Sequence, residues 1–384
     1  MKKEIIYLDH NATTPVDPRV VDAMLPYLYE NYGNPSSDHY FGWYAADAVE
    51  QAREHVAGIV HANPGELYFT SGATEAINMA VIGYCMAGKH RGNHVVTCKT
   101  EHSAVLETFK ELENRGFEVT WLEVDANGNI AFEDLKNSLR ENTILVSVML
   151  ANNETGLIMP IRKYSQWVRS RNIAFMTDLT QAVGKIRVDL KELDVDLAVF
   201  SSHKVNGPKG VGALYIRSEI TSKINPRWFG GKQEKGIRPG TLNVPGIVGF
   251  GEACLLAASE IVEKQEHLLE LRTTLENALQ ELNGVHINAS TEDRLPNTTN
   301  VTFQGIDGSK LLRQLNRLAV SRGSACSSNY VKPSHVLLAM GHSETNALAS
   351  LRISTGMQTT KEDLLIAIHD IRKANEQLTN VIYE

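Results

Sequence analysis

Hydrophobic positions along the chain fall into short runs rich in valine, isoleucine and aromatic residues. Most of the runs are separated by segments in which apolar side chains recur with helical spacing. This alternation predicts βαβ units and a mainly parallel sheet. The last run follows "NGPKG" too closely for a helical crossover, so we expect it to pair antiparallel. The predicted strands cover residues 66–70, 94–98, 118–124, 144–150, 173–177, 196–201 and 211–216.

The pattern changes after residue 250. A long amphipathic helix is predicted over about residues 251–282, followed by short strands at "NTTNVTF" and "LAVS", a helix at "SKLLRQLNRL" and a last helix near residues 360–379. This order is typical of a second, smaller α+β domain. We therefore expect an α/β protein with two domains. The large domain would cover residues 16–250, and the small domain residues 1–15 and 251–384.

Composition limits the classes of function. The 384 residues are 42% hydrophobic and 22% charged, with a formal net charge of −7 and no basic block, which argues against stable nucleic-acid binding. The start, "MKKEIIYLDHN", lacks the apolar core of a secretory signal, and "INMAVIGYCMAG" is too short to span a bilayer. We expect a cytoplasmic protein that makes no membrane contact.

The four cysteines are widely and irregularly spaced. They are Cys85, Cys98, Cys254 and Cys326, and none belongs to a CxxC pair. We therefore expect reduced thiols and no local metal site. Cys326 is unusual because it lies in "SRGSACSS", a run of small residues that offers little to bury a thiol.

Polar residues follow five of the predicted strands. The segments are "SGATEA", "KTEHSA", "ANNETG", "DLTQ" and "SSHKVNGPKG". Any one alone is compatible with turn chemistry, because glycine, asparagine, aspartate and serine dominate turns. Ligands of open α/β sheets bind beyond the carboxyl ends of the strands. Five polar segments on that edge therefore predict a ligand site.

Single residues of this edge each allow two interpretations. Gly72 lies at a turn, and Thr74 and Glu75 open a helix. The free N–H groups of this helix could bind a phosphate, or the sequence could be a plain cap. The loop has neither a dinucleotide nor a P-loop motif. Asp178 could cap a helix or bind a ring nitrogen of a cofactor. His102 could be a core histidine or a flat partner for an aromatic cofactor.

Lys204 is the most informative of these residues. It follows His203 at the end of a strand expected to be buried, where lysine is rare without a partner. A desolvated lysine has a lowered pKa and can form a Schiff base. Lys209 in "GPKG" fits an ordinary surface lysine better. A phosphate loop, an aspartate for a ring nitrogen, a stacking histidine and a Schiff-base lysine together describe a pyridoxal phosphate site.

Long ordered motifs carry a family resemblance. They are "YLDHNATTPVDPRV", "YGNPSS", "FTSGATEA", "TEHSAVLET", "ANNETG", "SSHKVNGPKGVGALYIR", "RPGTLNVPGIVGFGEA", "GSACSS" and "PSHVLLAMG". With these motifs, which run nearly from end to end, the chain resembles the NifS/IscS-type cysteine desulfurases. These belong to the class V aminotransferase group of fold type I pyridoxal phosphate enzymes. The resemblance implies a large domain with a mainly parallel seven-stranded sheet.

The resemblance also implies residue roles. Lys204 would bind the cofactor covalently, His102 would stack on its ring and Asp178 would bind the ring nitrogen. The implied cofactor-binding set is Ala73, Thr74, His102, Asn153, Asp178, Gln181, Ser201, His203, Lys204 and Thr241. The implied substrate-binding set is Asn34, Asn153 and Arg352. Gln181 would contact the phenolic oxygen, and Thr241 would reach the phosphate of a neighbouring subunit, which implies a homodimer.

The implied reaction releases sulfur from L-cysteine. The thiolate of Cys326 would attack the substrate sulfur, leaving a persulfide on Cys326 and releasing L-alanine. His102 and Lys204 would complete the catalytic set. The sulfur would pass to an acceptor protein in iron–sulfur assembly, tRNA thiolation or DNA phosphorothioation. The alternatives are a selenocysteine lyase, an aminotransferase of the same fold, or a non-enzymatic protein that only docks a sulfur acceptor.

Three positions depart from the family pattern. "GGKQE" places Lys232 where a glycine is usual, and "SRGSAC" places Arg322 where a small residue is common. The segment around Asp178 reads "TDLTQ" rather than the commoner "VDAxQ", yet Asp178 and Gln181 are both present.

Overall fold

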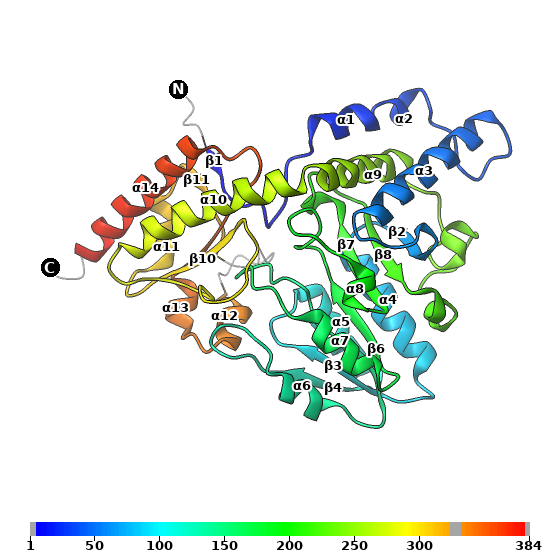
Figure 1. The fold of residues 1–384 in the computed structure, drawn as a ribbon, viewed down its shortest axis with the longest axis horizontal. Coiled ribbons are helices and arrows are strands. Elements are labelled where there is room, and N and C mark those ends of the chain that lie inside the picture. Colours follow the sequence, from blue (N-terminus) through cyan, green and yellow to red (C-terminus); the bar gives the residue numbers. More distant parts are fainter. Residues whose placement is uncertain (1–4, 323–331, 381–384) are drawn as a thin grey trace.

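A seven-stranded sheet forms the centre of the larger part of the molecule (Figure 1). The structure is a computed structural model that describes residues 5–322 and 332–380. The spatial order of the strands is β2-β8-β7-β6-β5-β3-β4. Their bounds are β2 Leu67–Thr70, β3 His94–Cys98, β4 Glu118–Leu122, β5 Thr143–Ser147, β6 Ala174–Asp178, β7 Leu197–Ser201 and β8 Gly212–Ile216. Each strand lies within or overlaps its predicted range, which confirms the α/β fold class.

Strand β8 runs against the rest of the sheet. It pairs antiparallel with β7, with Ser201 opposite Gly212, and antiparallel with β2 on its other side. The pairs β3–β4, β3–β5, β5–β6 and β6–β7 are all parallel. The prediction of one antiparallel run is therefore confirmed. Because β8 is reversed, its first residues lie at the same edge as the last residues of its neighbours.

Helices cover both faces of the sheet. One face packs against α1 Pro18–Met24, α2 Pro26–Tyr29, α3 Tyr40–Gly58, α6 Phe132–Ser138, α7 Ile161–Arg169, α8 Leu190–Leu193 and α9 Val244–Ser259. The other face packs against α4 Ala73–Gly88 and α5 Ser103–Asn114. The strands are hydrophobic on both sides, as a sheet between two helical layers requires.

A smaller unit lies beside the large sheet, and the described ends of the chain both belong to it (Figure 1). Its antiparallel sheet has the order β12-β10-β9, and β1 pairs parallel with β11. The strands are β1 Ile6–Tyr7, β9 Val285–Ile287, β10 Thr298–Phe303, β11 Leu318–Ala319 and β12 Ser350–Ser354. The helices are α10 Ile261–Gln280, α11 Gly308–Gln314, α12 His335–Ala339, α13 Glu344–Leu348 and α14 Lys361–Asn380.

The single long helix predicted after residue 250 is wrong. Two helices, α9 and α10, occupy this stretch and meet at Glu260 with a bend of 75°. Each helix buries its apolar side in a different core. Cys254 and Ala257 of α9 belong to the core under the large sheet, whereas Leu271 and Leu275 of α10 belong to the core of the smaller unit. The bend lets one continuous chain serve both cores, and we propose the domain boundary at Glu260.

No single helix in the described part of the chain has the length and apolar character needed to cross a membrane; only α9 and α10 taken together, across their bend, would meet that test by length and composition.

Candidate active site

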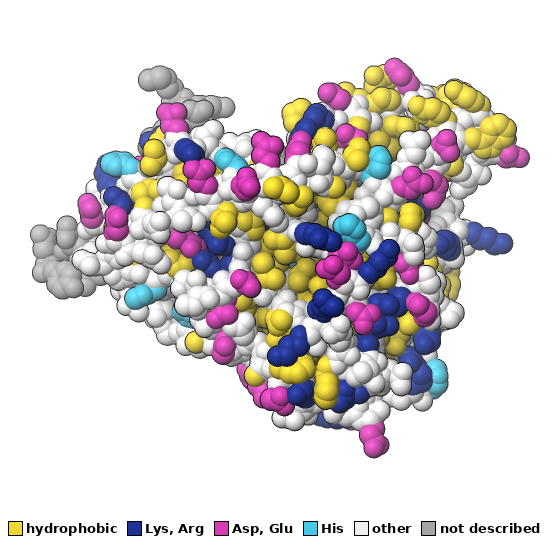
Figure 2. Space-filling model, viewed as in Figure 1, with side chains coloured by type: hydrophobic (Ala, Val, Ile, Leu, Met, Phe, Trp, Pro, Cys, Tyr) yellow, Lys and Arg dark blue, Asp and Glu magenta, His cyan; other side chains and the backbone are white. Residues whose placement is uncertain are grey.

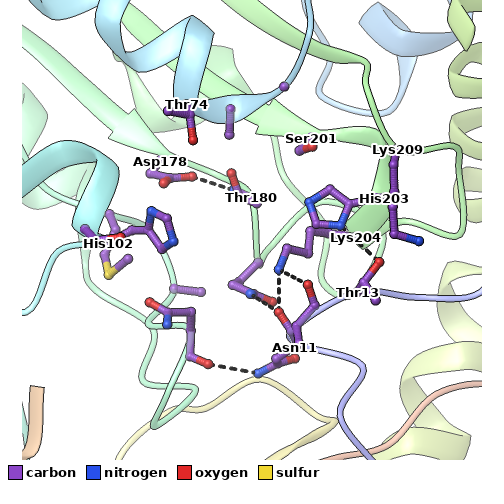
Figure 3. Close-up of a pocket in the computed structure, with 18 of the residues that line it drawn as sticks. Asn11, Thr13, Thr74, His102, Asp178, Thr180, Ser201, His203, Lys204 and Lys209 are labelled. Carbon is purple, nitrogen blue, oxygen red and sulfur yellow. Dashed lines mark hydrogen bonds between the residues drawn. The ribbon is translucent and has the colours of Figure 1, made fainter. Parts of the chain in front are cut away.

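A cavity of about 550 Å³ opens at the carboxyl-end edge of the large sheet. All five polar segments predicted from the sequence contribute to its lining (Figure 3). Asn11, Ala12 and Thr13 come to it from the N-terminal segment, and Arg352 from β12 of the smaller unit. The sequence predicted no role for these three residues, although they lie in the motif "YLDHNATTPVDPRV". Lys209 is exposed, as expected of a surface lysine, but it lines the cavity as well.

One end of the cavity is built to hold an anion. Helix α4 begins at Ala73, directly after Gly72, whose φ of +153° suits glycine better than other residues. The N–H groups of the first helical turn have no acceptor within the helix. Ser201 lies beside this turn, since a Cβ on Gly72 would sit 3.8 Å from its Oγ. In the same turn, Glu75 is neutralised by Arg238 at 2.9 Å.

Two polar side chains line the wall next to this anion site. Asp178 ends β6 and is buried, and its Oδ1 accepts a hydrogen bond from the Thr180 amide at 2.8 Å. His102 precedes α5, and its Nδ1 accepts a hydrogen bond from the Ala104 amide at 3.1 Å. In the neutral ring the proton is therefore on Nε2. Burial lowers the pKa of His102, so this neutral form is favoured.

Lys204 lies opposite these residues, across the drawn cavity (Figure 3). Its Nζ donates hydrogen bonds to the backbone carbonyl oxygens of Asn11 at 2.5 Å and Ala12 at 2.7 Å. Its pKa is lowered to about 8, mainly by burial and also by the positive charge of Arg352. A lysine amine with a pKa near neutrality is the form that attacks carbonyl carbons.

Arg352 supplies a second positive group. It is almost fully buried, and its two terminal nitrogens donate to the Asn153 carbonyl at 3.0 Å and to Asp9 Oδ1 at 2.8 Å. Arg352 Nε and Asn153 Oδ1 are buried and have no partner among the described residues. Buried polar atoms normally find partners, so these two atoms are suited to contact a bound molecule.

The predicted site residues fall into three groups. Those that line the cavity are Ala73, Thr74, His102, Asn153, Asp178, Gln181, Ser201, His203, Lys204 and Arg352. Thr241 lies instead along a neighbouring groove, and exposed Asn34 follows Tyr32 on the segment between α2 and α3. Cys326 lies outside the described residues. Thr241 was expected to act on the site of a second subunit, which a single chain does not contain.

The family is decided by comparison with known proteins. The model of the aminotransferase class-V family matches residues 6–366. The chain belongs to this family. It is 46% identical to cysteine desulfurase IscS of Neisseria gonorrhoeae over 96% of this chain and 92% of the relative. It is 45% identical to cysteine desulfurase IscS of Methylococcus capsulatus over 98% and 94%.

Solved structures agree with this assignment. A NifS-like protein superposes with a TM-score of 0.91 and 40% identity, covering 97% of this chain and all of that one. DndA from Streptomyces lividans superposes with a TM-score of 0.76 and 38% identity, covering 89% of this chain and 97% of that one. The resemblance to this enzyme group and the expected seven-stranded sheet are therefore confirmed.

Pyridoxal phosphate, the cofactor expected from the sequence, fits the residues of the cavity. The helix start at Ala73 with Ser201 offers donors to a phosphate, as described above. Asp178 offers a carboxylate to a protonated ring nitrogen. Lys204 offers an amine to an aldehyde. Each group thus meets a residue of the required chemistry, and the cavity volume is within the range of ordinary cofactor sites.

Proposed function

We propose that this chain is a pyridoxal phosphate-dependent cysteine desulfurase that transfers the sulfur of L-cysteine to Cys326. The convergence of Lys204, Asp178, His102 and Arg352 on one cavity carries the proposal. Bound pyridoxal phosphate supplies an electron sink for the substrate. The relatives named as cysteine desulfurases cover nearly the whole chain, which supports the choice among reactions of this family.

The described residues have distinct tasks in this reaction. Lys204 would hold the cofactor, and its lowered pKa keeps a useful share of the amine neutral for that bond. Asp178 would hold the ring nitrogen through a charge-assisted hydrogen bond. His102, neutral and with its proton on Nε2, is placed to exchange a proton with the substrate.

Arg352 and Asn153 would bind the carboxylate of L-cysteine. A guanidinium offers several donors in one plane, which matches the geometry of a carboxylate. Arg352 Nε has no partner among the described residues, and Asp9 accepts a hydrogen bond from another nitrogen of the same guanidinium. These two features would favour a substrate that carries a carboxylate. A substrate carboxylate would compete with Asp9 for the same cation, so the anionic end of the amino acid fixes its orientation.

Cys326 is the best candidate for the sulfur acceptor. The three described cysteines, Cys85, Cys98 and Cys254, are buried in the cores, and burial raises the pKa of each thiol. A buried neutral thiol is a poor nucleophile. Ser321, five positions before Cys326 in sequence, bridges to the backbone of Arg352 in the cavity wall. Five residues of chain reach at most about 17 Å from Ser321.

The test is to compare the wild-type chain with Cys326→Ala in the presence of L-cysteine. We expect the wild type to form L-alanine in step with a protein-bound persulfide, and the variant to lose turnover while keeping the cofactor's yellow colour. Cys254→Ala is the matched control, because that thiol is buried away from the cavity. Full turnover by Cys326→Ala would refute the proposal. A keto acid product in place of alanine would instead indicate an aminotransferase.

We also propose that the enzyme acts as a homodimer. Aromatic side chains are exposed together on α2, the start of α3 and the segment between them; they are Tyr29, Tyr32, Tyr40, Phe41, Trp43 and Tyr44. Figure 2 shows hydrophobic side chains gathered over this end of the molecule. A patch of this kind is a common sign of a protein interface. Asn34 lies within the same segment, so a second chain packed there would bring it close to a neighbouring molecule.

Complementation between subunits tests the shared site. Thr241 lies along a groove of about 830 Å³ that also contains Ser71 and Thr74 of the phosphate end. A Thr241→Glu chain would repel the partner's phosphate, and a Lys204→Ala chain would lack the reactive amine. We expect each to be inactive alone and part of the activity to return when the two are unfolded and refolded together. If mixing restores nothing although mixed dimers form, Thr241 does not act across subunits.

The acceptor of the persulfide is proposed to be another protein. Trapping a mixed disulfide on Cys326 in a cell extract, with Cys326→Ser as the control, would identify it. A disulfide partner recovered equally with the variant would be unrelated to the sulfur transfer.

A further inference from the structure

Lys185 is a buried lysine next to the cavity that the reaction described above does not use. Its side chain is 3% exposed, and its Nζ donates to Gln181 Oε1 at 2.5 Å and to Asn11 Oδ1 at 2.9 Å. No carboxylate within residues 5–322 and 332–380 pairs with it. Lysine is almost never fully buried without a charged partner. Its burial therefore calls for a specific role.

Three other positive side chains act electrostatically on Lys185. Lys204, Lys264 on α10 and Arg352 on β12 act with burial to lower the pKa of Lys185. His10, just after β1, is in turn affected by Lys185 and has its pKa lowered to about 4, mainly by burial. Burying Lys185 as a fourth basic group beside Lys204, Lys264 and Arg352 is unfavourable for folding. A function at the cavity is a sufficient reason to keep it there.

The contact with Gln181 has a definite chemical consequence. Both contacts of Lys185 Nζ are made to oxygen atoms, so Nζ donates in each, and the amide group of Gln181 turns its oxygen toward Lys185. The amide nitrogen of Gln181 then donates one hydrogen to the backbone carbonyl of Asn11 at 3.0 Å. Its second hydrogen is left for the cavity, which Gln181 lines. Without Lys185 the amide could turn round and present an acceptor instead.

The same carbonyl of Asn11 also accepts the hydrogen bond from Lys204. Lys185, Gln181, Asn11 and Lys204 are thus joined in one continuous chain of hydrogen bonds. The first and last members are both lysines, and the two between them are uncharged amides. A change at Lys185 therefore reaches the reactive amine through direct contacts.

We propose that Lys185 is a positioning residue that fixes the Gln181 amide as a hydrogen-bond donor toward the phenolic oxygen of the cofactor. The proposal rests on the proposed function, because it needs pyridoxal phosphate in the cavity. A donor to the phenolic oxygen weakens the hold of that oxygen on the proton that it shares with the link between Lys204 and the cofactor.

The visible absorption band of the holoenzyme measures this effect without turnover. Its colour changes as the link between Lys204 and the cofactor gains or loses a proton. In Lys185→Met the amide of Gln181 is no longer fixed as a donor. The phenolic oxygen then holds the shared proton more strongly. We expect the pKa of the band to rise by about one unit, which corresponds to about the free energy of one hydrogen bond.

Two comparisons separate positioning from a general loss of charge. Lys264→Met also removes a buried lysine, one whose Nζ contacts Asn206 Oδ1 at 3.4 Å and which does not line the cavity. It should leave the band's pKa unchanged. Gln181→Leu should raise that pKa as Lys185→Met does, and the double variant should add little to either alone, because the two residues act in series.

Each outcome has one reading. A band in Lys185→Met with the wild-type pKa, or effects of Lys185→Met and Gln181→Leu that simply add, would overturn the positioning role. A wild-type chain that forms no band with pyridoxal phosphate would overturn the proposed function instead. If Lys185→Met does not fold, Lys185→Gln removes the charge and the donor-only contact with a side chain that can pair with the amide. It should also raise the pKa, and an unchanged value would equally reject the proposal.

Discussion

Arg53 on α3 and Glu234 form a two-pronged ion pair that is buried beside β2. The guanidinium nitrogens lie 2.9 and 2.7 Å from the two carboxylate oxygens. Glu234 Oε2 also accepts the amide hydrogen of Phe69 at 2.7 Å, and Arg53 donates to the Leu67 carbonyl at 2.9 Å. The pair therefore holds β2, which leads to the turn at Gly72, against the loop that carries Thr241.

Breaking this pair should destabilise the fold. Glu234→Gln leaves the buried guanidinium without its main counter-charge, which typically costs about 3 to 5 kcal/mol. Urea unfolding followed by intrinsic fluorescence measures the loss. Glu107→Gln is the control, because its pair with Lys110 is exposed on both sides and contributes little. Equal midpoints for the two variants would show that the Arg53 pair is not important for stability.

Asp9 should set the pH at which the apoenzyme captures its cofactor. Its carboxylate contacts Arg352 at 2.8 Å. It also raises the pKa of Lys204 against burial and Arg352, and the net pKa is about 8. Asp9→Asn removes that support, so the pKa of Lys204 should fall. Because only the neutral amine reacts, the rate of appearance of the visible band should then reach its midpoint at lower pH. Asp22→Asn on α1, an exposed carboxylate, should change nothing, and a midpoint that moves upward would contradict the assigned charges.

Asp178→Asn should weaken cofactor binding. The amide can still accept the Thr180 hydrogen bond, so the fold should persist, but the charge that pairs with a protonated ring nitrogen is gone. A hydrogen bond to a charged group is worth about 1.5 to 3 kcal/mol, which corresponds to roughly a 10- to 100-fold loss of affinity. Fluorescence titration of the apoenzyme measures it. An unchanged dissociation constant would mean that Asp178 does not hold the ring.

The same variant should change a neighbouring acid. Burial and the charge of Asp178 raise the pKa of Glu101 to about 8. Removing that charge should lower the pKa of Glu101, which infrared difference spectra of its carboxyl group can follow. A pKa that stays where it was would leave burial alone as the cause.

Gly251 on α9 should tolerate no larger side chain. A Cβ there would lie 2.6 Å from the Cα of Ala52 on α3, and neither helix backbone can easily yield. We expect Gly251→Ala to cost about 1 to 3 kcal/mol of stability, measured by urea unfolding. Gly58→Ala, at the end of α3, is the matched control, because its Cβ would meet nothing within 4 Å. If both variants unfold at the same midpoint, the close approach of α3 and α9 is not limiting.

The sequence predicted the large sheet well because each strand is a short apolar run with clear polar ends. The antiparallel β8 was predictable from the short connection before it. The break at Glu260 was not, because "LLAASEIVEK" contains neither glycine nor proline to mark it. Only the position of two separate cores explains why α9 ends there.

The sequence predicted those residues of the site that directly follow a strand. Asp178 and Lys204 could be placed because parallel strand ends share one edge. Asn11 and Lys185 could not, since the contact that joins them to each other connects positions 174 apart in the sequence. No local pattern reports such a pairing, although the motif containing Asn11 was visible.

The many bonds of Asn11 bear on the order in which a newly made chain acquires its parts. Apart from Arg352, every residue lining the cavity lies before position 211 and leaves the ribosome early. Asn11 is also held from the other side, by Thr298 Oγ1 and Ser354 Oγ, at 2.9 Å each. Those anchors are synthesised near the end. The nascent large domain would thus assemble most of the cofactor site early, but Asn11 would lack these two contacts until translation is almost complete. The cofactor would then bind last.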